Sequence, residues 1–246
     1  MSGHSKWATI KHAKGAADAK RGQMFTKFIK EISIAARMGG GLVESNPRLR
    51  TAILKAKAAN MPKDNIERAI KKGTGELEGV NYEELTYEAY AHGGVALLIE
   101  VLTDNKNRAA ADVRNILTRA GGQLATAGSV SRLFKRQGVI TLDGEKYTED
   151  HVMETVLESG AEDVSLSDGI IEVTTAPEDF EAVVNALNAK EFETMSAEIS
   201  MVAGADVQLD NESTAKVIKL IDRLEENDDV QNVYSNLSIP DGFEAE

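Results

Sequence analysis

The sequence predicts an α+β multidomain protein, in which a small N-terminal three-helix domain is followed by two α/β sandwich domains, the last one ferredoxin-like and inserted into the middle one. The first observation is size, since 246 residues with 42% hydrophobic content can form more than one core. The second is charge: residues 1–75 hold 16 Lys and Arg against five Asp and Glu, whereas the rest of the chain holds 12 against 35. The third is pattern, because apolar residues recur at helical spacing in the first part, and helix and strand patterns alternate after it.

The basic charge begins in an N-terminal arm. Residues 4–21 combine cations with small side chains and offer little apolar surface, so we expect an arm that becomes ordered on a partner. A strong charge split within one chain favours a polyanionic partner, and nucleic acid is the commonest polyanion in a cell. The arm contributes five predicted phosphate contacts: Lys6, Lys11, Lys14, Lys20 and Arg21.

A first helix is predicted from Lys20 to Met38. Apolar residues repeat at three- and four-residue steps and form one stripe: Phe25, Phe28, Ile29, Ile32, Ala35 and Ala36. The opposite side carries four cations, which we expect to face nucleic acid: Lys20, Lys27, Lys30 and Arg37. Residues 39–41 are three glycines and are predicted to end the helix, because glycine tolerates the left-handed conformation.

Two shorter helices are predicted next. Asn46 is expected to cap the second helix, with Pro47 at its first position, and Pro62 is expected to start the third, which Gly73 ends. The second helix adds four candidate phosphate contacts: Arg48, Arg50, Lys55 and Lys57. The connection before this helix is longer than the tight turn of a helix-turn-helix motif. Contact with phosphate is therefore favoured over reading of bases in the major groove.

The acidic remainder begins with a predicted β-hairpin. Residues 85–90 alternate in polarity, and residues 95–102 are almost continuously apolar, as in a strand at the centre of a sheet. Asp104 or Asn105 is expected to cap a helix that continues to Ala120. A glycine-containing loop then leads to a predicted strand over Val130–Phe134.

A second unit is predicted from Gly138, with the element order βαββαβ of the ferredoxin-like, or split βαβ, arrangement. Its strands are expected at residues 139–142, 163–166, 170–174 and 194–202, and its helices at 148–159 and from Pro177. A helix after Asp210 and a strand over Val230–Tyr234 are expected to complete the first sheet. The predicted domains are therefore residues 1–77, a discontinuous domain of 78–137 with 204–246, and an inserted domain of 138–203.

The sequence favours a protein that is not an enzyme. It contains no cysteine, so disulfides, thiol nucleophiles and Cys-based metal sites are excluded. No phosphate-binding loop or hydrolase motif is present, and the four histidines share no metal-ligand spacing. We therefore predict no catalytic residue, no cofactor and no metal. The N-terminus lacks the apolar core of a signal peptide and no apolar run could span a bilayer, so we expect a cytoplasmic protein with no membrane partner.

Two further segments are candidates for binding. Lys106, Asn107 and Arg108 lie at a predicted helix N-terminus, where backbone N–H groups and cations together favour phosphate. An exposed, capped helix start explains the same residues equally well. The turn of His92, Gly93 and Gly94 could contact a ligand, although a solvated turn is the simpler interpretation.

The chain resembles the YebC family in a series of motifs along its whole length: GHSKW at 3–7, DAKRG at 18–22, FTK at 25–27, NPRLR at 46–50, NMPKDNI at 60–66, AIKKG at 69–73, LTDNKNR at 102–108 and GSV at 128–130. The resemblance implies three domains, one helical and two α/β. It also implies a bacterial cytoplasmic protein of a kind described as probable transcriptional regulators that bind DNA. Mitochondrial relatives are implied to be translational activators, including an activator of cytochrome c oxidase.

Our leading hypothesis is a nucleic-acid-binding regulator of transcription that contacts the phosphate backbone through its basic N-terminal domain. The alternative is a translation factor that binds ribosomal RNA, with glycine loops at 92–94 and 121–128 approaching a functional centre. A weaker alternative is a ligand-sensing regulator that uses the ferredoxin-like domain. The acidic domains could also compete for the basic face and inhibit binding. The sequence leaves the oligomeric state open.

Overall fold

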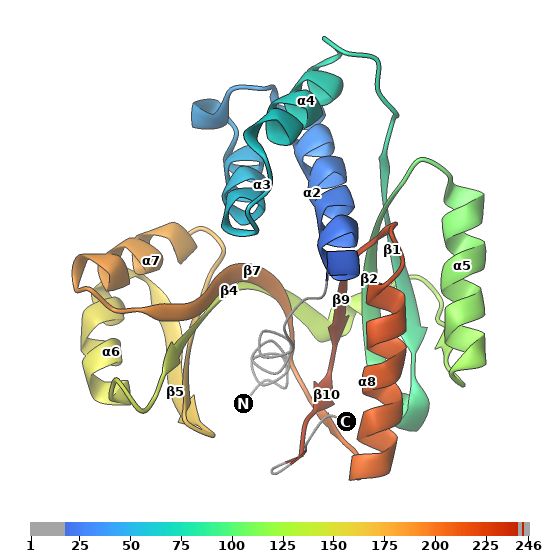
Figure 1. The fold of residues 1–246 in the computed structure, drawn as a ribbon. Helices are drawn as coiled ribbons and strands as arrows, with labels where there is room; N and C mark the ends of the chain where they lie inside the picture. Colours follow the sequence, from blue (N-terminus) through green and yellow to red (C-terminus); the bar gives the residue numbers. More distant parts are fainter. Residues whose placement is uncertain (1–17, 241–242, 244–246) are drawn as a thin grey trace.

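The computed structural model describes residues 18–240 and 243. Figure 1 shows a helical unit at one end of the molecule and sheets with their own helices at the other. The predicted arm lies outside the described residues as far as residue 17. The chain is therefore a mixed α/β protein of several structural units, as the patterns predict.

The helical unit consists of α2 (Asp18–Gly39), α3 (Pro47–Ala58) and α4 (Lys63–Thr74). The predicted apolar stripe of α2 is confirmed, because Ile32 and Ala35 are buried in one cluster with Leu49 of α3 and Ile66 of α4. The helix ends at the predicted glycines, with Gly40 at a φ of +83°. Asn46 caps α3 as expected: its Oδ1 accepts from the backbone N–H of Leu49 at 3.1 Å.

The predicted role of Gly73 as a helix stop is wrong. Helix α4 continues to Thr74, and Gly75 ends it in the left-handed conformation, with a φ of 82°. A Cβ at position 73 would lie 2.2 Å from the carbonyl oxygen of Ser33. Gly73 is thus required because α2 and α4 approach each other closely at this point.

The first sheet has the order β3-β1-β2-β9, with β2 inside it, as predicted. Its strands are Gln123–Leu124, Glu83–Tyr90, Ala96–Thr103 and Val230–Ser235. Helices α5 (Lys106–Arg119) and α8 (Asn211–Glu225) share its core through residues such as Leu117 and Leu220. Asn105, and not Asp104, caps α5, because its Oδ1 accepts from the backbone N–H of Arg108 at 3.1 Å.

The predicted strand over Val130–Phe134 is absent from the structure. Ser131–Leu133 form a 3₁₀ turn instead. The carboxylate of Glu88 holds this turn, because it accepts backbone N–H groups of Gly128 at 2.7 Å and Ser131 at 3.0 Å, and that of Val130. Such bonds satisfy the backbone locally and compete with strand pairing.

The second sheet has the order β5-β6-β4-β7, and all its neighbouring strands are antiparallel. Its strands are β4 (Phe134–Asp143), β5 (Ala161–Ser167), β6 (Ile170–Thr175) and β7 (Thr194–Ala203), and its helices are α6 (Glu149–Val156) and α7 (Phe180–Ala189). The predicted order βαββαβ is confirmed. Strand β4 begins four residues before the predicted boundary at Gly138, and α7 begins after a turn from Ala176 to Asp179 and not at Pro177. The inserted-domain interpretation stays a prediction.

Apolar contacts connect the two sheets with each other. Ala96 and Leu98 of β2 form a buried cluster with Val130 and Phe134. A short parallel pair, β8 (Val207–Gln208) with β10 (Leu237–Ser238), lies beside α8 in Figure 1. Within the described residues, the apolar cluster of the helical unit contains only residues between Phe25 and Ile70. The buried apolar cluster of the helical unit is therefore separate from those of the sheets.

Candidate nucleic-acid interface

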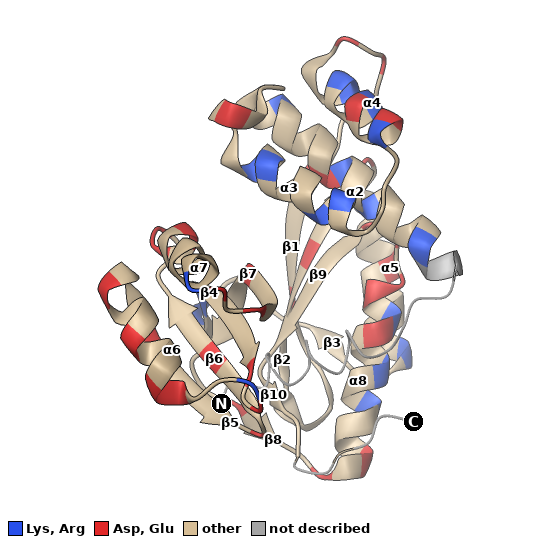
Figure 2. Ribbon diagram, turned by 60° about the vertical axis from the view of Figure 1, so that its left-hand side comes forward, with Lys and Arg blue, Asp and Glu red and all other residues tan. Residues whose placement is uncertain are grey.

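Charge is distributed between the units much as the sequence predicts. Figure 2 shows Lys and Arg on α2, α3 and α4, whereas α6 and α7 carry Asp and Glu. Three predicted phosphate contacts, Lys6, Lys11 and Lys14, lie outside the described residues. Lys20 falls in the first turn of α2, and the exposed Arg21 follows it.

Three polar side chains of α2 contact the end of α8. We call Gln23, Lys27 and Lys30 the α2 stripe, and residues 225–229 the α8 end. Gln23 Nε2 donates to the carbonyl oxygen of residue 226 at 3.1 Å, Lys27 Nζ to that of residue 225 at 2.6 Å, and Lys30 Nζ to that of residue 228 at 2.8 Å. The last carbonyls of a helix lack partners within the helix and form the negative end of its dipole. The α2 stripe therefore caps α8 from another part of the chain.

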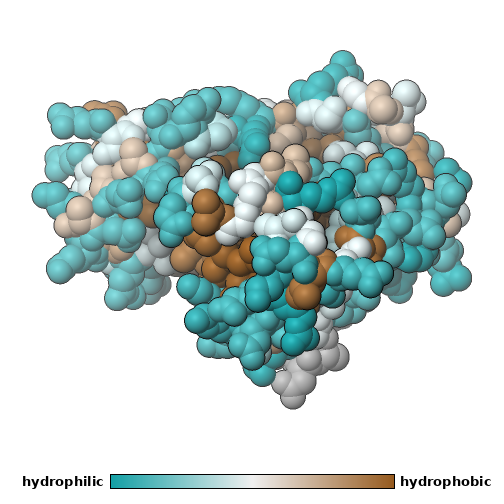
Figure 3. Space-filling model, turned by 90° about the horizontal axis from the view of Figure 1, so that it is seen from above, coloured by the Kyte–Doolittle hydropathy of each residue, from teal (hydrophilic) through white to brown (hydrophobic). Residues whose placement is uncertain are grey.

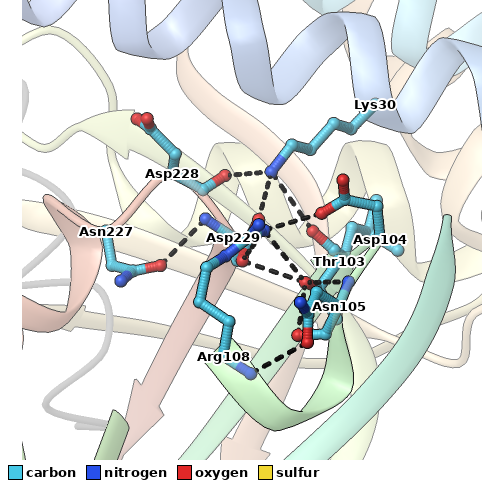
Figure 4. Close-up of polar contacts among 9 residues, drawn as sticks. Lys30, Thr103, Asp104, Asn105, Arg108, Asn227, Asp228 and Asp229 are labelled. Atoms are coloured by element: carbon cyan, nitrogen blue, oxygen red, sulfur yellow. Dashed lines mark hydrogen bonds and ion pairs between the residues drawn. The ribbon is translucent and has the colours of Figure 1, made fainter. Parts of the chain in front are cut away.

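The expectation that Lys30 faces outward is wrong. Its ammonium group is 2.5 Å from Asp229 Oδ1, and the two side chains are only 8% and 6% exposed. Thr103 Oγ1 and Arg108 Nη2 donate to the other carboxylate oxygen of Asp229 at 2.9 and 2.8 Å. Figure 4 shows these side chains converging from α2, β2, α5 and the turn after α8. Every oxygen of the Asp229 carboxylate is thus bonded, as a buried ion requires.

The surroundings of Asp229 stabilise its charged form. Burial raises the pKa of this carboxyl, but the hydrogen bonds from Lys30, Arg108 and Thr103 outweigh burial and leave the pKa below its ordinary value. The pKa of Arg108 is raised by its hydrogen bonds with Asp229 and Asp104. Both ions therefore remain charged at neutral pH.

Several other predicted cations also contact acceptors of the same chain. Arg37 Nη1 donates to Asn81 Oδ1 at 3.1 Å, and Lys55 Nζ lies 3.3 Å from Glu198 Oε2 on β7. Arg48 binds both carboxylate oxygens of Glu31, at 2.7 and 3.0 Å, and also the carboxylate of Glu84. These contacts connect the helical unit to both sheets and to the segment before β1.

The other two candidate segments are satisfied locally. Lys106 pairs with Glu83 at 2.6 Å, and Arg108 contacts Asp229, so this run is directed at carboxylates of its own chain. Asn107 is exposed. His92, Gly93 and Gly94 form an exposed turn between β1 and β2, in which both glycines have positive φ angles. Gly93 has a φ of 69°, which side chains rarely adopt, and a Cβ there would also require a methyl group of Leu209, 2.4 Å away, to shift.

Several exposed cations lie on α3 and α4. Lys57 is exposed, and Arg50 is half-buried and donates to the carbonyl of residue 44 at 3.5 Å. The sequence prediction omitted three exposed cations of α4: Arg68, Lys71 and Lys72. Their spacing of three and four residues places them on one face, which we call the α4 basic face. The spacing of these three cations is visible in the sequence.

A hollow of about 160 Å³ lies beside the α4 basic face. It is lined by α2, by the end of α4 and by residues up to Tyr82, and two cations, Arg37 and Lys72, contribute to its wall. Across the described part of the chain, no three His, Cys, Asp or Glu side chains are grouped in a way that could hold a metal ion. Nor does any described helix combine the length and apolar character needed to cross a membrane.

Comparisons with known proteins agree along the chain. The family model "TACO1/YebC protein N-terminal domain" matches residues 5–76, and "TACO1/YebC second and third domain" matches residues 82–237. A relative from Treponema denticola is 67% identical over 99% of both chains. One from Syntrophobacter fumaroxidans is 57% identical over 98% of this chain and 97% of the other. Both relatives are named "Probable transcriptional regulatory protein". The crystal structure of a conserved hypothetical protein from Aquifex aeolicus has a TM-score of 0.81 and 46% identity, covering 93% of this chain and 95% of that one.

Proposed function

The chain belongs to the TACO1/YebC family, and from this premise we propose that it is a non-enzymatic regulator of transcription that binds the phosphate backbone of DNA. The observation that carries the proposal is the α4 basic face, whose cations are exposed and have no carboxylate within ion-pairing distance among the described residues. Lys57 and Arg50 add charge on the neighbouring helix α3. Cations in this arrangement bind phosphates without reading bases.

The character of the surface supports a polar partner. Figure 3 views the molecule from the end where the helical unit lies, and most of this face is hydrophilic, with an apolar area near its centre. Binding of nucleic acid uses cations and hydrogen bonds more than apolar area. The negative charge of the α/β units would repel DNA, which favours approach from the helical end.

Salt dependence provides a quantitative test. Each phosphate contact with duplex DNA contributes about −0.9 to the slope of log affinity against log salt concentration. If the three cations of the α4 basic face each contact one phosphate, replacing them with Gln reduces the slope by about 2.7 and weakens binding at least tenfold at low salt. Fluorescence anisotropy with a labelled 30-base-pair DNA duplex measures both quantities.

The control is a second triple variant with the same change in charge. Lys190, Lys219 and Arg223 are exposed and lie outside the helical unit, so replacing them with Gln is expected to leave binding within about twofold of the wild type. Equal losses in the two triple variants, or binding that does not depend on salt, would refute contact through the α4 basic face.

A parallel experiment distinguishes DNA from ribosomal RNA. The protein is sedimented through a sucrose gradient from a gentle lysate at low salt, with and without nuclease, and the bound nucleic acid is sequenced. Migration apart from ribosomal particles with enriched promoter DNA is expected. Migration with ribosomal particles and enriched ribosomal RNA would instead assign the same cations to a translational role.

A further inference from the structure

We propose that the α2 stripe is a second nucleic-acid contact, which the α8 end covers in this structure and which is exposed when the helical unit rotates away from the sheets. This inference extends the proposed function, because it names a further surface for the same phosphate ligand. The stripe presents Lys27 and Lys30, with Gln23 one turn earlier, at steps of four and three residues on one side of α2. Such spacing lines side chains along one helix face.

The groups that the α2 stripe binds resemble a phosphate backbone in their chemistry. They are three carbonyl oxygens of the α8 end and the carboxylate of Asp229, all of them hydrogen-bond acceptors with negative charge or partial charge. Glu225, Glu226 and Asp228 add three more acids to the same short segment. A row of phosphate oxygens offers the same acceptors and a greater charge, so it competes for the same two cations.

The contacts of the α2 stripe with the α8 end are hydrogen bonds and an ion pair. The helical unit also contacts the rest of the chain through a hydrogen bond from Arg37 to Asn81 and through two ion pairs, Lys55–Glu198 and Arg48–Glu84. No buried apolar cluster extends from the helical unit into the sheets in this part of the chain. Small, polar contacts between units favour relative motion more than a large apolar interface does.

The buried Lys30–Asp229 pair does not by itself fix the closed arrangement. Taking two charges out of water costs free energy, and their attraction repays this cost only in part. The pair therefore contributes little net stability compared with two hydrated ions, although removing one partner alone is costly. Opening of the whole junction rehydrates both ions together and avoids the cost of a lone buried charge.

The segment that joins the units suits a hinge. Residues 75–82 connect α4 to β1, and they include Gly75 at a φ of 82° and Gly79. Leu77 and Val80 in this segment are 43% and 56% exposed, so little of it is packed. Exposed segments with few buried contacts open at low free-energy cost.

The test compares two neighbouring substitutions with the same change in charge. Asp229→Asn removes the carboxylate that faces Lys30, whereas Asp228→Asn changes an exposed carboxylate that Figure 4 shows directed away from Lys30. Because the chain has no cysteine, Thr51→Cys on α3 and Lys219→Cys on α8 provide two unique sites for a fluorescent donor and acceptor. Energy transfer then reports the separation of the units in the full-length protein without nucleic acid.

The expected result is lower energy transfer in Asp229→Asn and at least threefold tighter binding of the 30-base-pair duplex, with Asp228→Asn close to the wild type. Lys30→Gln should also lower energy transfer but should not tighten binding, because it removes a cation of the α2 stripe. In the protein with an intact junction, addition of the duplex should itself lower energy transfer. This last measurement holds even if a substitution prevents folding.

Three outcomes would overturn the inference: unchanged energy transfer in Asp229→Asn, lower energy transfer in Asp229→Asn without tighter binding, or no response of the intact protein to the duplex. The same experiments distinguish failure of this inference from failure of the proposed function. If the wild type binds the duplex and loses binding with the α4 basic face, but Asp229→Asn gains nothing, then the proposed function stands and the concealed contact is refuted.

Discussion

Replacing Lys30 with Met is expected to destabilise the closed junction between the α2 stripe and the α8 end. Met retains much of the apolar stem but removes the ammonium group that contacts Asp229 and the carbonyls of residues 102 and 228. Loss of one partner of a buried ion pair costs about 3–5 kcal/mol, because the remaining charge is left without compensation. Opening of the junction limits the measured loss, and because Thr103 and Arg108 still donate to Asp229, the closed arrangement loses the lower value, about 3 kcal/mol. This corresponds to about a hundredfold change in equilibrium constant.

Two measurements test this value. Urea denaturation followed by circular dichroism gives the free energy of unfolding, and hydrogen exchange of the amides at the α8 end reports the junction directly. Lys57→Met is the control, since Lys57 is an exposed residue of the same unit and its replacement should change stability by less than about 0.5 kcal/mol. If Lys30→Met were as stable as Lys57→Met and its exchange were unchanged, the assignment of a buried, compensated ion pair would be refuted.

The remaining predictions concern pH, a loop and a glycine contact. The pKa of Asp229 is lower in the folded protein than its unfolded value of about 3.8. The stability that Asp229 gives the junction is therefore complete above pH 3.8 and is lost as the pH falls through the folded pKa. Energy transfer between the units should fall in acid in the wild type but not in Asp229→Asn. Glu88→Gln should lower the melting temperature and speed hydrogen exchange of the amides of residues 128, 130 and 131, because the charged acceptor of these groups is lost; unchanged exchange would contradict this. Gly73→Ala should destabilise by about 1–3 kcal/mol, because the new methyl group meets a backbone carbonyl of α2. Gly22→Ala, where nothing lies within 4 Å of the new Cβ, should stabilise by about 0.5–1 kcal/mol in the same thermal melts.

The elements that the sequence predicted well are those with a strong local signal. The continuous apolar run of β2 and the stripe of α2 are burial patterns, and burial is what the structure shows for both. Positions that depend on a distant contact were predicted less well. The role of Gly73 could not be predicted, because both a helix end and a close approach of two helices favour glycine, and the sequence alone does not distinguish them. The loop after Leu124 is shaped by the carboxylate of Glu88, about forty residues earlier.

In the candidate site too, local patterns were predicted from the sequence but distant contacts were not. Helical spacing placed Lys27 and Lys30 on one side of α2, and the structure agrees, but spacing does not reveal what that side contacts. Asp229 lies 199 residues from Lys30 in the chain. One signal did exist: Glu225 and its acidic neighbours lie at a helix C-terminus, where negative charge is unfavourable unless a cation compensates it. Lys27 and Lys30 of the α2 stripe supply such cations from a distant part of the chain.

The charge split between the two parts of the chain therefore has two physical consequences that respond differently to salt. The α4 basic face is exposed, so its attraction for phosphate is screened within about 8 Å at physiological ionic strength. The Lys30–Asp229 pair is buried and is screened far less. Under the proposed function, rising salt weakens the contact of the α4 basic face with nucleic acid while the α2 stripe stays covered. The two proposed surfaces then act in sequence: the α4 basic face determines the encounter, and a bound polyanion competes at high local concentration for the cations of the α2 stripe.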